Sequence, residues 1–344
     1  MRKSIGIVLF LITFTACVKD KPQDVIQPQV QLTNAKKVYI VNEGNFGSPN
    51  ASVSLYDPGN GAVIENFYQT QNPSSPTIGD VAQCLSFIND NFYLVVNHSG
   101  KIIVCDDQFK KTNQITGLSS PRYIQAVSNQ KAYVSDFNGN AINIINLNTN
   151  TKTGTIPCPG WTEKMVLIYN KVFVCNIKRN YTYVINTIND LKTDSILVGP
   201  NAGSLIIDKY DKLWVLSGGD SSNSVLGKLV KIDPLTNQVE TSFQFNSGDH
   251  PREFCINKTK DTLYFLNGGV FRMPIASSAL PSNEFINRGT KNFYGLGINP
   301  NDHTIYAADA LDYNSKANIY IYDASGVEKK HFNAGINANG FYFE

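Results

Sequence analysis

The chain has 344 residues, of which 42% are hydrophobic and 17% are charged, and its formal net charge at pH 7 is +2. That length exceeds most single-core domains. The near balance of charges argues against a nucleic-acid-binding protein, which would carry clustered Lys and Arg. Helix-favouring residues are scarce, while Asn, Thr, Val, Ile, Tyr and Gly are plentiful. This mixture favours many short strands joined by tight turns.

The first residues predict an export signal. Arg2 and Lys3 are followed by the apolar residues 5–14, a run too short to span a bilayer. The sequence Thr15-Ala16-Cys17 resembles the lipobox of bacterial lipoproteins, with a phenylalanine at position 14 where that family has leucine. We therefore expect residues 1–16 to be a lipoprotein signal peptide and Cys17 to carry the lipid. The alternative is an ordinary secretory signal.

Residues 17–35 predict the lipidated cysteine and a flexible tether, because the stretch is rich in Lys, Asp, Gln and Pro and has no apolar period. Lipid chains hold a protein at a membrane surface without threading it through. The pair Lys19-Asp20 is similar to signals that send lipoproteins to the outside of an outer membrane. The expected location is therefore the outer membrane, lipid-anchored and exposed at the cell surface.

A repeat occupies the rest of the chain. Seven short apolar runs, each containing an aromatic side chain, start 40 to 54 residues apart. A period near 40 to 50 residues with only strand-like content indicates the four-stranded antiparallel blades of a β-propeller. The runs cover residues 38–42, 92–96, 132–136, 172–176, 213–217, 263–267 and 305–309.

These runs predict an all-β chain in which residues 36–344 form one seven-bladed β-propeller. Residues 339–343 form an extra inner strand with no blade after them, whereas the first blade begins at Val38 without an inner strand of its own. We expect the last strand to complete the first blade and so to remove the free sheet edges. A ring of six or eight blades is the alternative.

Five cysteines follow Cys17, an odd number without a Cys-x-x-Cys pair, so a disulfide framework or a zinc site is not expected. Four of them lie inside apolar runs and predict small buried hydrophobic residues. Cys158, between two prolines, is expected in a loop. The four are Cys84, Cys105, Cys175 and Cys255.

Two sets of loops share one face of the predicted ring, namely those after the aromatic runs and those that lead into the inner strands. Loop faces with mixed aromatic and polar groups are common binding sites. No metal site is predicted, although two histidines lie on this face and make a metal, or the metal centre of a ligand, conceivable. The expected ligand-binding residues are Phe46, His98, Arg122, Phe137, Trp161, Arg179, Tyr181, His250, Arg252, Tyr294, Asp312 and Tyr313. Blade packing and solvated loops are the alternative roles for individual members.

No local catalytic motif is present: the chain has no G-x-S-x-G, H-E-x-x-H, Walker or Rossmann sequence. We therefore predict no catalytic residues and expect a binding protein rather than an enzyme. Propeller enzymes place acids and histidines around the axis, where local motifs do not reveal them, so an enzyme stays the minority interpretation.

The repeat, with its Leu-Tyr-Val openings and Asn-x-Ile-x-Ile-Ile-Asn strands, resembles the YncE-like and lactonase-like propellers. Residues 41–47 (Val-Asn-Glu-Gly-Asn-Phe-Gly) and 51–57 (Ala-Ser-Val-Ser-Leu-Tyr-Asp) are similar to the opening of the DUF5074 family of lipoprotein propellers. One branch of that family comprises the cell-surface vitamin B12-binding propeller lipoproteins.

That resemblance implies a surface protein that captures a corrinoid (vitamin B12), or another scarce nutrient, for a TonB-dependent outer-membrane transporter. The corrinoid would be a ligand and not a required cofactor. The expected partners are thus a small molecule and the transporter, with the membrane contacted only through the lipid anchor. The alternatives are a scaffold for a protein or glycan at the cell surface and, less favoured, a lactonase-like hydrolase that uses axial acids such as Glu43 or Asp136.

Overall fold

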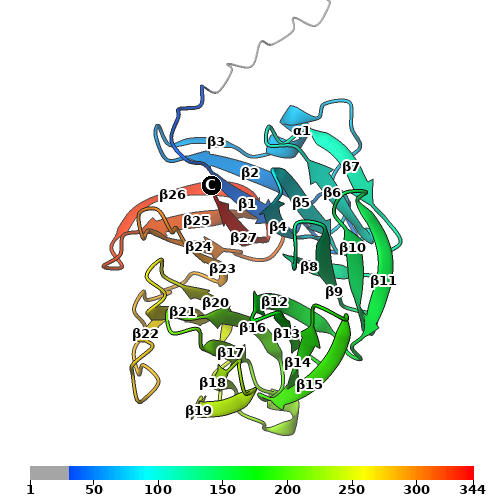
Figure 1. Cartoon of the computed structure of the whole chain (residues 1–344). Coiled ribbons are helices and arrows are strands. Elements are labelled where there is room, and N and C mark those ends of the chain that lie inside the picture. The colour runs from blue at the N-terminus through cyan, green and yellow to red at the C-terminus, as the bar shows by residue number, and fades with distance from the viewer. Residues whose placement is uncertain (1–30) are drawn as a thin grey trace, which may run out of the picture. The chain divides into compact units, whose positions relative to one another are not determined.

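The computed structural model describes residues 31–344, and they form seven antiparallel sheets arranged around an axis (Figure 1). The predicted seven-bladed β-propeller is therefore confirmed. Among these residues no helix is long and apolar enough to cross a membrane. The predicted signal peptide, Cys17 and nearly all of the tether lie outside the described residues.

Each sheet runs outward from an inner strand at the axis. The first three sheets are β27 (Ala338–Phe343), β1 (Val38–Asn42), β2 (Ser52–Asp57) and β3 (Ala62–Ile64); β4 (Ala82–Ile88), β5 (Asn91–Val96), β6 (Lys101–Cys105) and β7 (Lys111–Ile115); and β8 (Pro121–Ala126), β9 (Lys131–Asp136), β10 (Ala141–Asn146) and β11 (Thr151–Pro157).

The last four sheets follow the same order. They are β12 (Thr162–Ile168), β13 (Lys171–Asn176), β14 (Tyr181–Asn186) and β15 (Leu191–Leu197); β16 (Ala202–Ile207), β17 (Leu213–Ser217), β18 (Lys228–Asp233) and β19 (Gln238–Gln244); β20 (Arg252–Ile256), β21 (Thr262–Asn267) and β22 (Gly269–Pro274); and β23 (Phe293–Ile298), β24 (Ile305–Asp309), β25 (Lys316–Tyr322) and β26 (Glu328–Ile336).

The ring is closed by the last strand, as the sequence predicts. β27 pairs with β1 in antiparallel register, from Val38 opposite Phe343 to Asn42 opposite Ala338. β27 also contacts β4 and β23, the inner strands on either side of it. Because β1 and β27 belong to one sheet, opening the ring requires breaking that pairing.

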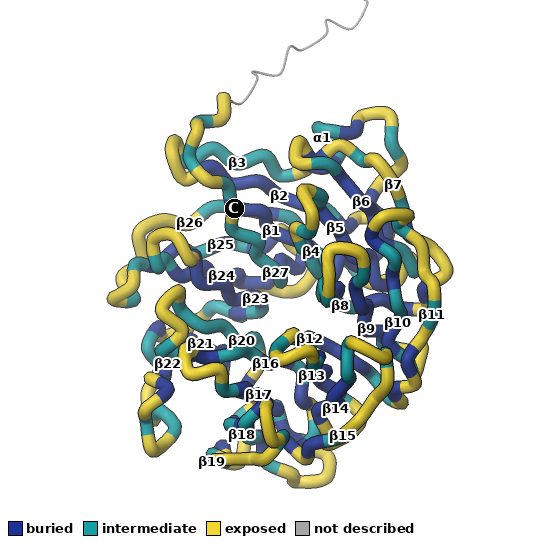
Figure 2. The backbone as a smooth tube through the Cα atoms, viewed as in Figure 1, coloured by how far each residue is buried: buried dark blue, intermediate teal, exposed yellow. Residues whose placement is uncertain are grey.

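The core is divided into seven apolar clusters, one between each pair of neighbouring sheets. The second strands of the sheets supply most of it, because both of their faces are covered by neighbouring sheets; β1, for example, is buried at all five positions. In Figure 2 buried residues follow these strands, whereas exposed residues follow the loops and outer strands. This explains why the middle of each second strand is apolar in the sequence.

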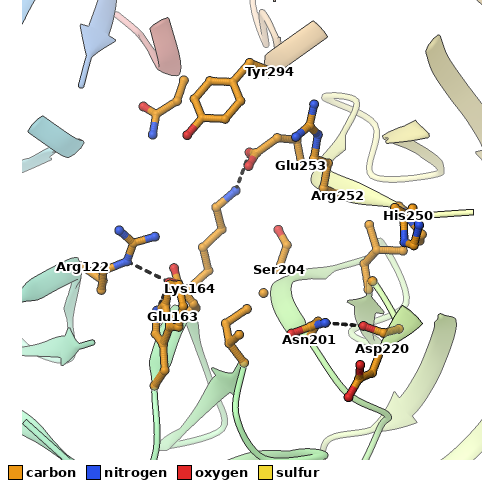
Figure 3. A pocket seen from close by; sticks show the side chains of 18 of the residues that line it. Arg122, Glu163, Lys164, Asn201, Ser204, Asp220, His250, Arg252, Glu253 and Tyr294 are labelled. Carbon is orange, nitrogen blue, oxygen red and sulfur yellow. Dashed lines mark hydrogen bonds and ion pairs between the residues drawn. The ribbon is translucent and has the colours of Figure 1, made fainter. Parts of the chain in front are cut away.

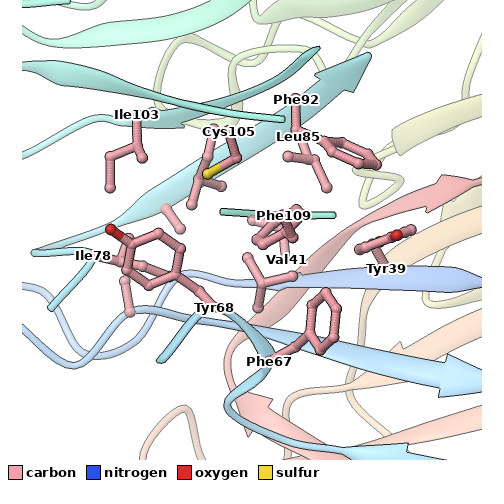
Figure 4. Close-up of a cluster of buried hydrophobic side chains, with 14 of the residues drawn as sticks. Tyr39, Val41, Phe67, Tyr68, Ile78, Leu85, Phe92, Ile103, Cys105 and Phe109 are labelled. Carbon is pink, nitrogen blue, oxygen red and sulfur yellow. The ribbon is translucent and has the colours of Figure 1, made fainter. Parts of the chain in front are cut away.

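Two sheets depart from the simple repeat. The sixth has three strands, and residues 275–292 follow β22 without a fourth strand, making one isolated bridge between Val270 and Ile286. The connection from β3 to β4 contains a short helix, α1 (Phe67–Gln71). Phe67 and Tyr68 pack with Phe109 into the first core cluster (Figure 4), so this connection is part of the core and accounts for the longest repeat spacing.

The described cysteines are all free. Cys105 and Cys175 are buried, as expected, whereas Cys84 and Cys255 are only partly buried. Cys158 follows β11 outside any strand, but it is fully buried beside Tyr133 in an interblade cluster. Burial raises the pKa of the Cys158 thiol to about 12, which makes it a weak nucleophile at neutral pH.

The chain contacts the propeller a few residues before Lys36. The Thr33 hydroxyl donates to Asp57 Oδ1 at 2.7 Å, and the Thr33 amide donates to Asp57 Oδ2 at 2.5 Å. Burial acts to raise the pKa of Asp57, but these bonds and one from Gly59 outweigh it and lower the pKa to about 2. Thr33 therefore holds the entry of the chain against the end of β2.

Candidate functional site

We call the side of the ring where the chain enters the inner strands the loop face; the loops after the second strands share it. Close to this face, all seven inner strands change register against their second strands, as a β-bulge does. A bulge adds a residue and re-aims its side chain. The residues in these shifts are Gln83, Arg122, Tyr123, Glu163, Lys164, Gly203, Glu253, Tyr294 and Asn339.

All nine of these bulge residues line one cavity of about 480 Å³. Figure 3 shows side chains from several sheets converging on this space. Glu43 joins them from the end of β1, and residues 218–222, from the loop that contains the short 3₁₀ helix η1 (Ser221–Asn223), form another wall. The repeated bulge therefore builds an axial pocket from the one or two bulge residues of every inner strand.

The wall between the second and fourth sheets is a polar network. Arg122 Nε donates to Glu163 Oε1 at 2.8 Å, and the Trp161 indole N–H donates to the same oxygen. Arg122 also donates to Gln83, whose amide donates to the Tyr123 hydroxyl at 3.1 Å. Burial raises the pKa of Glu163, with Arg122 opposing the shift.

An ion pair joins the fourth and sixth sheets next to this network. Lys164 Nζ lies 3.1 Å from Glu253 Oε2, joining β12 to β20 (Figure 3). Burial alone would lower the pKa of Lys164, but Glu253 raises it overall, so the lysine stays charged. Both residues also line a second cavity of about 330 Å³, together with Cys84 and Cys255. The pair thus lines both cavities.

Glu43 is the acid with a pKa near neutrality. The Tyr294 hydroxyl donates to Glu43 Oε2 at 2.9 Å, and the Asn339 amide donates to Oε1. Burial raises the pKa of Glu43 to about 7, although the bond from Tyr294 and the charge of Arg122 act in the opposite direction. The carboxyl can therefore exchange a proton at physiological pH.

Five of the twelve predicted ligand-binding residues line the axial cavity: Arg122, Trp161, His250, Arg252 and Tyr294. The exposed Arg252 donates from Nη2 to the Phe293 carbonyl at 2.6 Å, and its guanidinium lies 5.6 Å from the centre of the Tyr294 ring. It makes no ion pair with any described residue. Arg252 thus offers a cation without an acidic partner at the pocket.

The other seven predicted residues lie outside the cavity lining. Phe46, 77% exposed, packs on His98 with ring centres 4.4 Å apart, and His98 Nδ1 is bonded to Asp80. The rings of Phe137 and Trp161 pack nearly perpendicular to each other with their centres 4.2 Å apart, so Phe137 supports a lining residue.

Arg179 and Tyr181 are exposed in the loop after β13 and at the start of β14, respectively. Asp312 accepts hydrogen bonds from the backbone of Asn314 and Ser315 and so shapes its own loop. The ring of Tyr313 packs against that of Tyr294, with the ring centres 5.6 Å apart. The structure thus divides the predicted set into a central group and a peripheral ring.

Several lining residues were not predicted. Gln83, Glu163, Lys164, Gly203, Ser204 and Glu253 all line the cavity. The available signal was a polar or charged residue at the second or third place of an inner strand, as in Glu163-Lys164 directly before Met165-Val166. No group of three or more potential metal ligands occurs among the described side chains.

The fold and the site define a class: a seven-bladed β-propeller with a polar and aromatic axial pocket on its loop face. A family model for DUF5074, a domain of unknown function, matches residues 36–344. The chain belongs to the DUF5074 family. No curated protein sequence matches it.

Solved structures with this fold are distant in sequence. The periplasmic gluconolactonase of Pseudomonas aeruginosa matches with a TM-score of 0.68 at 11% identity, over 90% of this chain and 98% of that one. A quinonprotein alcohol dehydrogenase-like protein of Bacteroides thetaiotaomicron matches with a TM-score of 0.70 at 12% identity, over 90% and 78%. A protein of Lactobacillus plantarum matches with a TM-score of 0.68 at 12% identity, over 90% of this chain and 99% of that one. At such identities the likeness shows the fold alone.

Proposed function

We propose that this protein is a ligand-binding propeller whose axial cavity holds part of a small organic molecule. The observation that carries the proposal is the repeated bulge, which directs polar and aromatic side chains from all the inner strands except β16 into one space. Two buried polar atoms there, Ser204 Oγ and Asn339 Oδ1, have no hydrogen-bond partner. Buried polar groups are normally satisfied, so these atoms suit a ligand's polar groups.

The cavity has the size and character of a ligand site. Its volume of about 480 Å³ lies within the range of about 300–1,000 Å³ that small-molecule pockets span. Trp161 and Tyr294 offer flat apolar surfaces, while Arg252 offers donors for a carboxylate, phosphate or amide. A ligand would therefore be held by stacking and by directional hydrogen bonds together.

The finer proposal is that the ligand is a corrinoid, captured at the cell surface. The support is the similarity of residues 41–47 and 51–57 to the opening of the DUF5074 family, one branch of which comprises the vitamin B12-binding propeller lipoproteins. A whole corrinoid exceeds the cavity, so one edge would enter and the macrocycle would lie across the surrounding loops. Phe46 at 77% exposure, with Tyr181 and Tyr313 at 41% each, would supply apolar contacts there. Asp80 engages His98 Nδ1, which leaves Nε2 for a metal centre.

The anchor and the partner belong to the same proposal. Lipidation at Cys17 would hold the propeller at the outer membrane, and residues between Cys17 and Thr33 would give it reach. The captured corrinoid would pass to a TonB-dependent transporter beneath it. The support for this step is the Thr15-Ala16-Cys17 sequence together with the family resemblance.

Titration of the soluble protein, starting after Cys17, with cyanocobalamin tests the proposal by calorimetry and absorbance. We expect one-to-one binding that Arg252→Ala weakens about tenfold or more, because truncating a central interface arginine costs more than about 1 kcal/mol. Arg272→Ala is the matched control, since Arg272 is an exposed arginine on the outer strand β22. It should leave the affinity unchanged.

Absence of heat and of spectral change with cyanocobalamin and with cobinamide would contradict the corrinoid proposal. Binding that Arg252→Ala does not weaken would contradict the axial site. Co-purification with an outer-membrane protein or glycan that needs no small ligand would instead support a surface scaffold.

A lactonase-like hydrolase is the second candidate, and Glu43 is the observation that favours it. A carboxyl with a pKa of about 7 in a pocket beside Arg122 has the properties of a general base. Asp136 does not line the pocket; it is buried and accepts the backbone N–H groups of Ser120 and Gly139. Hydrolysis of gluconolactone above the spontaneous rate, lost in Glu43→Gln, would favour the enzyme; equal rates would exclude this substrate.

A further inference from the structure

The ring of bulge side chains has a gap at the fifth sheet. At the bulges of the other six inner strands the chain places large polar, charged or aromatic side chains, but β16 places Gly203 there. A Cβ built on Gly203 would come within 3.2 Å of one neighbouring atom, the terminal methyl of Ile177. That contact is closer than most Cβ atoms make, so Ile177 borders the space on one side, and no other atom beyond the chain neighbours would lie within 4 Å. The missing side chain therefore leaves a notch in the cavity wall over β16, bounded by Ile177.

The notch has one polar group without a partner. Ser204 is 5% exposed. Its Oγ is buried and neither donates nor accepts a hydrogen bond in the structure. Figure 3 shows Ser204 directed into the pocket. Leu216 and Ile177 line the cavity beside it as apolar residues. A hydroxyl, which both donates and accepts, is thus presented in otherwise apolar surroundings.

The charges of the neighbouring bulges are already paired. Arg122 is bonded to Glu163 at 2.8 Å, and Lys164 to Glu253 at 3.1 Å. An ionised ligand group placed in the notch would be desolvated without a free counter-ion. A neutral group that both donates and accepts, such as a primary amide or a hydroxyl, meets the serine without that penalty.

We propose that the notch formed by Gly203, Ser204, Ile177 and Leu216 is the subsite that receives an uncharged amide or hydroxyl group of the ligand, hydrogen-bonded by Ser204 Oγ. This inference rests on the proposed function of the cavity as a ligand site and adds the chemistry of one part of it. Arg252, outside the notch, binds any anionic part of the same ligand.

Two isosteric probes test the charge selectivity. Trifluoroacetamide is neutral and trifluoroacetate is anionic, and ¹⁹F NMR line broadening reports the binding of each to the soluble protein. We expect Gly203→Val, which fills the notch, to weaken trifluoroacetamide binding. Gly154→Val is the control, because a Cβ at Gly154 on the outer strand β11 meets only Ile144 Cδ1, at 3.5 Å. Trifluoroacetate broadening should be the same in all three proteins.

Ser204→Ala removes the hydroxyl without adding volume and guards against misfolding of the valine variant. We expect trifluoroacetamide to bind about three- to tenfold more weakly to it, the loss of about one hydrogen bond. Unchanged amide broadening in both variants, or equal losses for amide and carboxylate, would overturn the proposal. If cyanocobalamin does not bind but Ser204→Ala still weakens trifluoroacetamide binding, the corrinoid proposal fails and the proposal of an amide subsite stands.

Discussion

At the scale of single residues, Glu43 couples the pocket to pH. Its carboxyl accepts hydrogen bonds from Tyr294 and Asn339, and burial raises its pKa from 4.5 to about 7. The folded protein therefore holds this proton more tightly than the unfolded chain does. This stabilisation is therefore full below about pH 4.5 and is lost as the pH rises through about 7.

Glu43→Gln should remove this pH dependence, because glutamine stays neutral. The free energy of unfolding of the wild type should fall by up to about 3 kcal/mol between pH 5 and pH 8 relative to the variant. Denaturant unfolding at the two pH values measures this difference. Glu65→Gln, which changes an exposed carboxyl paired with Lys316, is the control and should track the wild type. Parallel pH curves for wild type and Glu43→Gln would show that Glu43 does not titrate in this range.

At the scale of elements, the strands and their order follow from the sequence, but the bulges do not. The second strands are apolar apart from polar residues at or near their ends, and their period predicts seven sheets and the closure by β27. A bulge depends on how two strands pair, and the sequence of one strand does not give this register. Glu163 and Lys164 therefore look like solvated strand residues until the shift between Thr162 and Met165 places them at the axis.

For the site, too, the sequence predicts which loops share one face but not the side chains that the bulges place at the axis. Loops around the face could be assigned from the strand order, and Arg122, Trp161 and Tyr294 lie at the cavity as expected. The peripheral position of Tyr181 and Asp312 depends on loop conformation, which local hydrogen bonds such as Ser315 to Asp312 decide. The notch at Gly203 arises from a missing side chain. It can be recognised only when the bulges of the other six inner strands are known to carry large side chains at the same place.

The ion pair between β12 and β20 makes a prediction at this scale. Lys164→Met and Glu253→Gln should each destabilise the protein, and the double variant should lose less than the sum. We expect a coupling energy of about 1–3 kcal/mol, because both side chains are partly buried. The exposed pair Lys316–Glu65 is the matched control, where about 0–1 kcal/mol is expected. Denaturant unfolding of the four proteins in each cycle measures both values, and additive losses at Lys164 and Glu253 would contradict a structural pair.

At the scale of the whole molecule, the closed ring separates stability from binding. Seven clusters between the sheets supply the core, and the pairing of β27 with β1 locks the circle. The pocket needs only one bulge position per blade and loops on one face, so its residues can change without altering the core. This explains how distant propellers share the fold at 11–12% identity without a shared site being implied.

The central claim is that the axial pocket on the loop face is where the ligand binds. Crystals of the soluble protein soaked with cyanocobalamin, measured at the cobalt absorption edge, test it most directly, because anomalous scattering locates the metal independently of the rest of the map. The account predicts one strong peak per molecule over the loop face, with an edge of the ligand reaching the cavity between Trp161 and Arg252. A peak on the outer strands or on the opposite face, or no peak despite measured binding in solution, would contradict it.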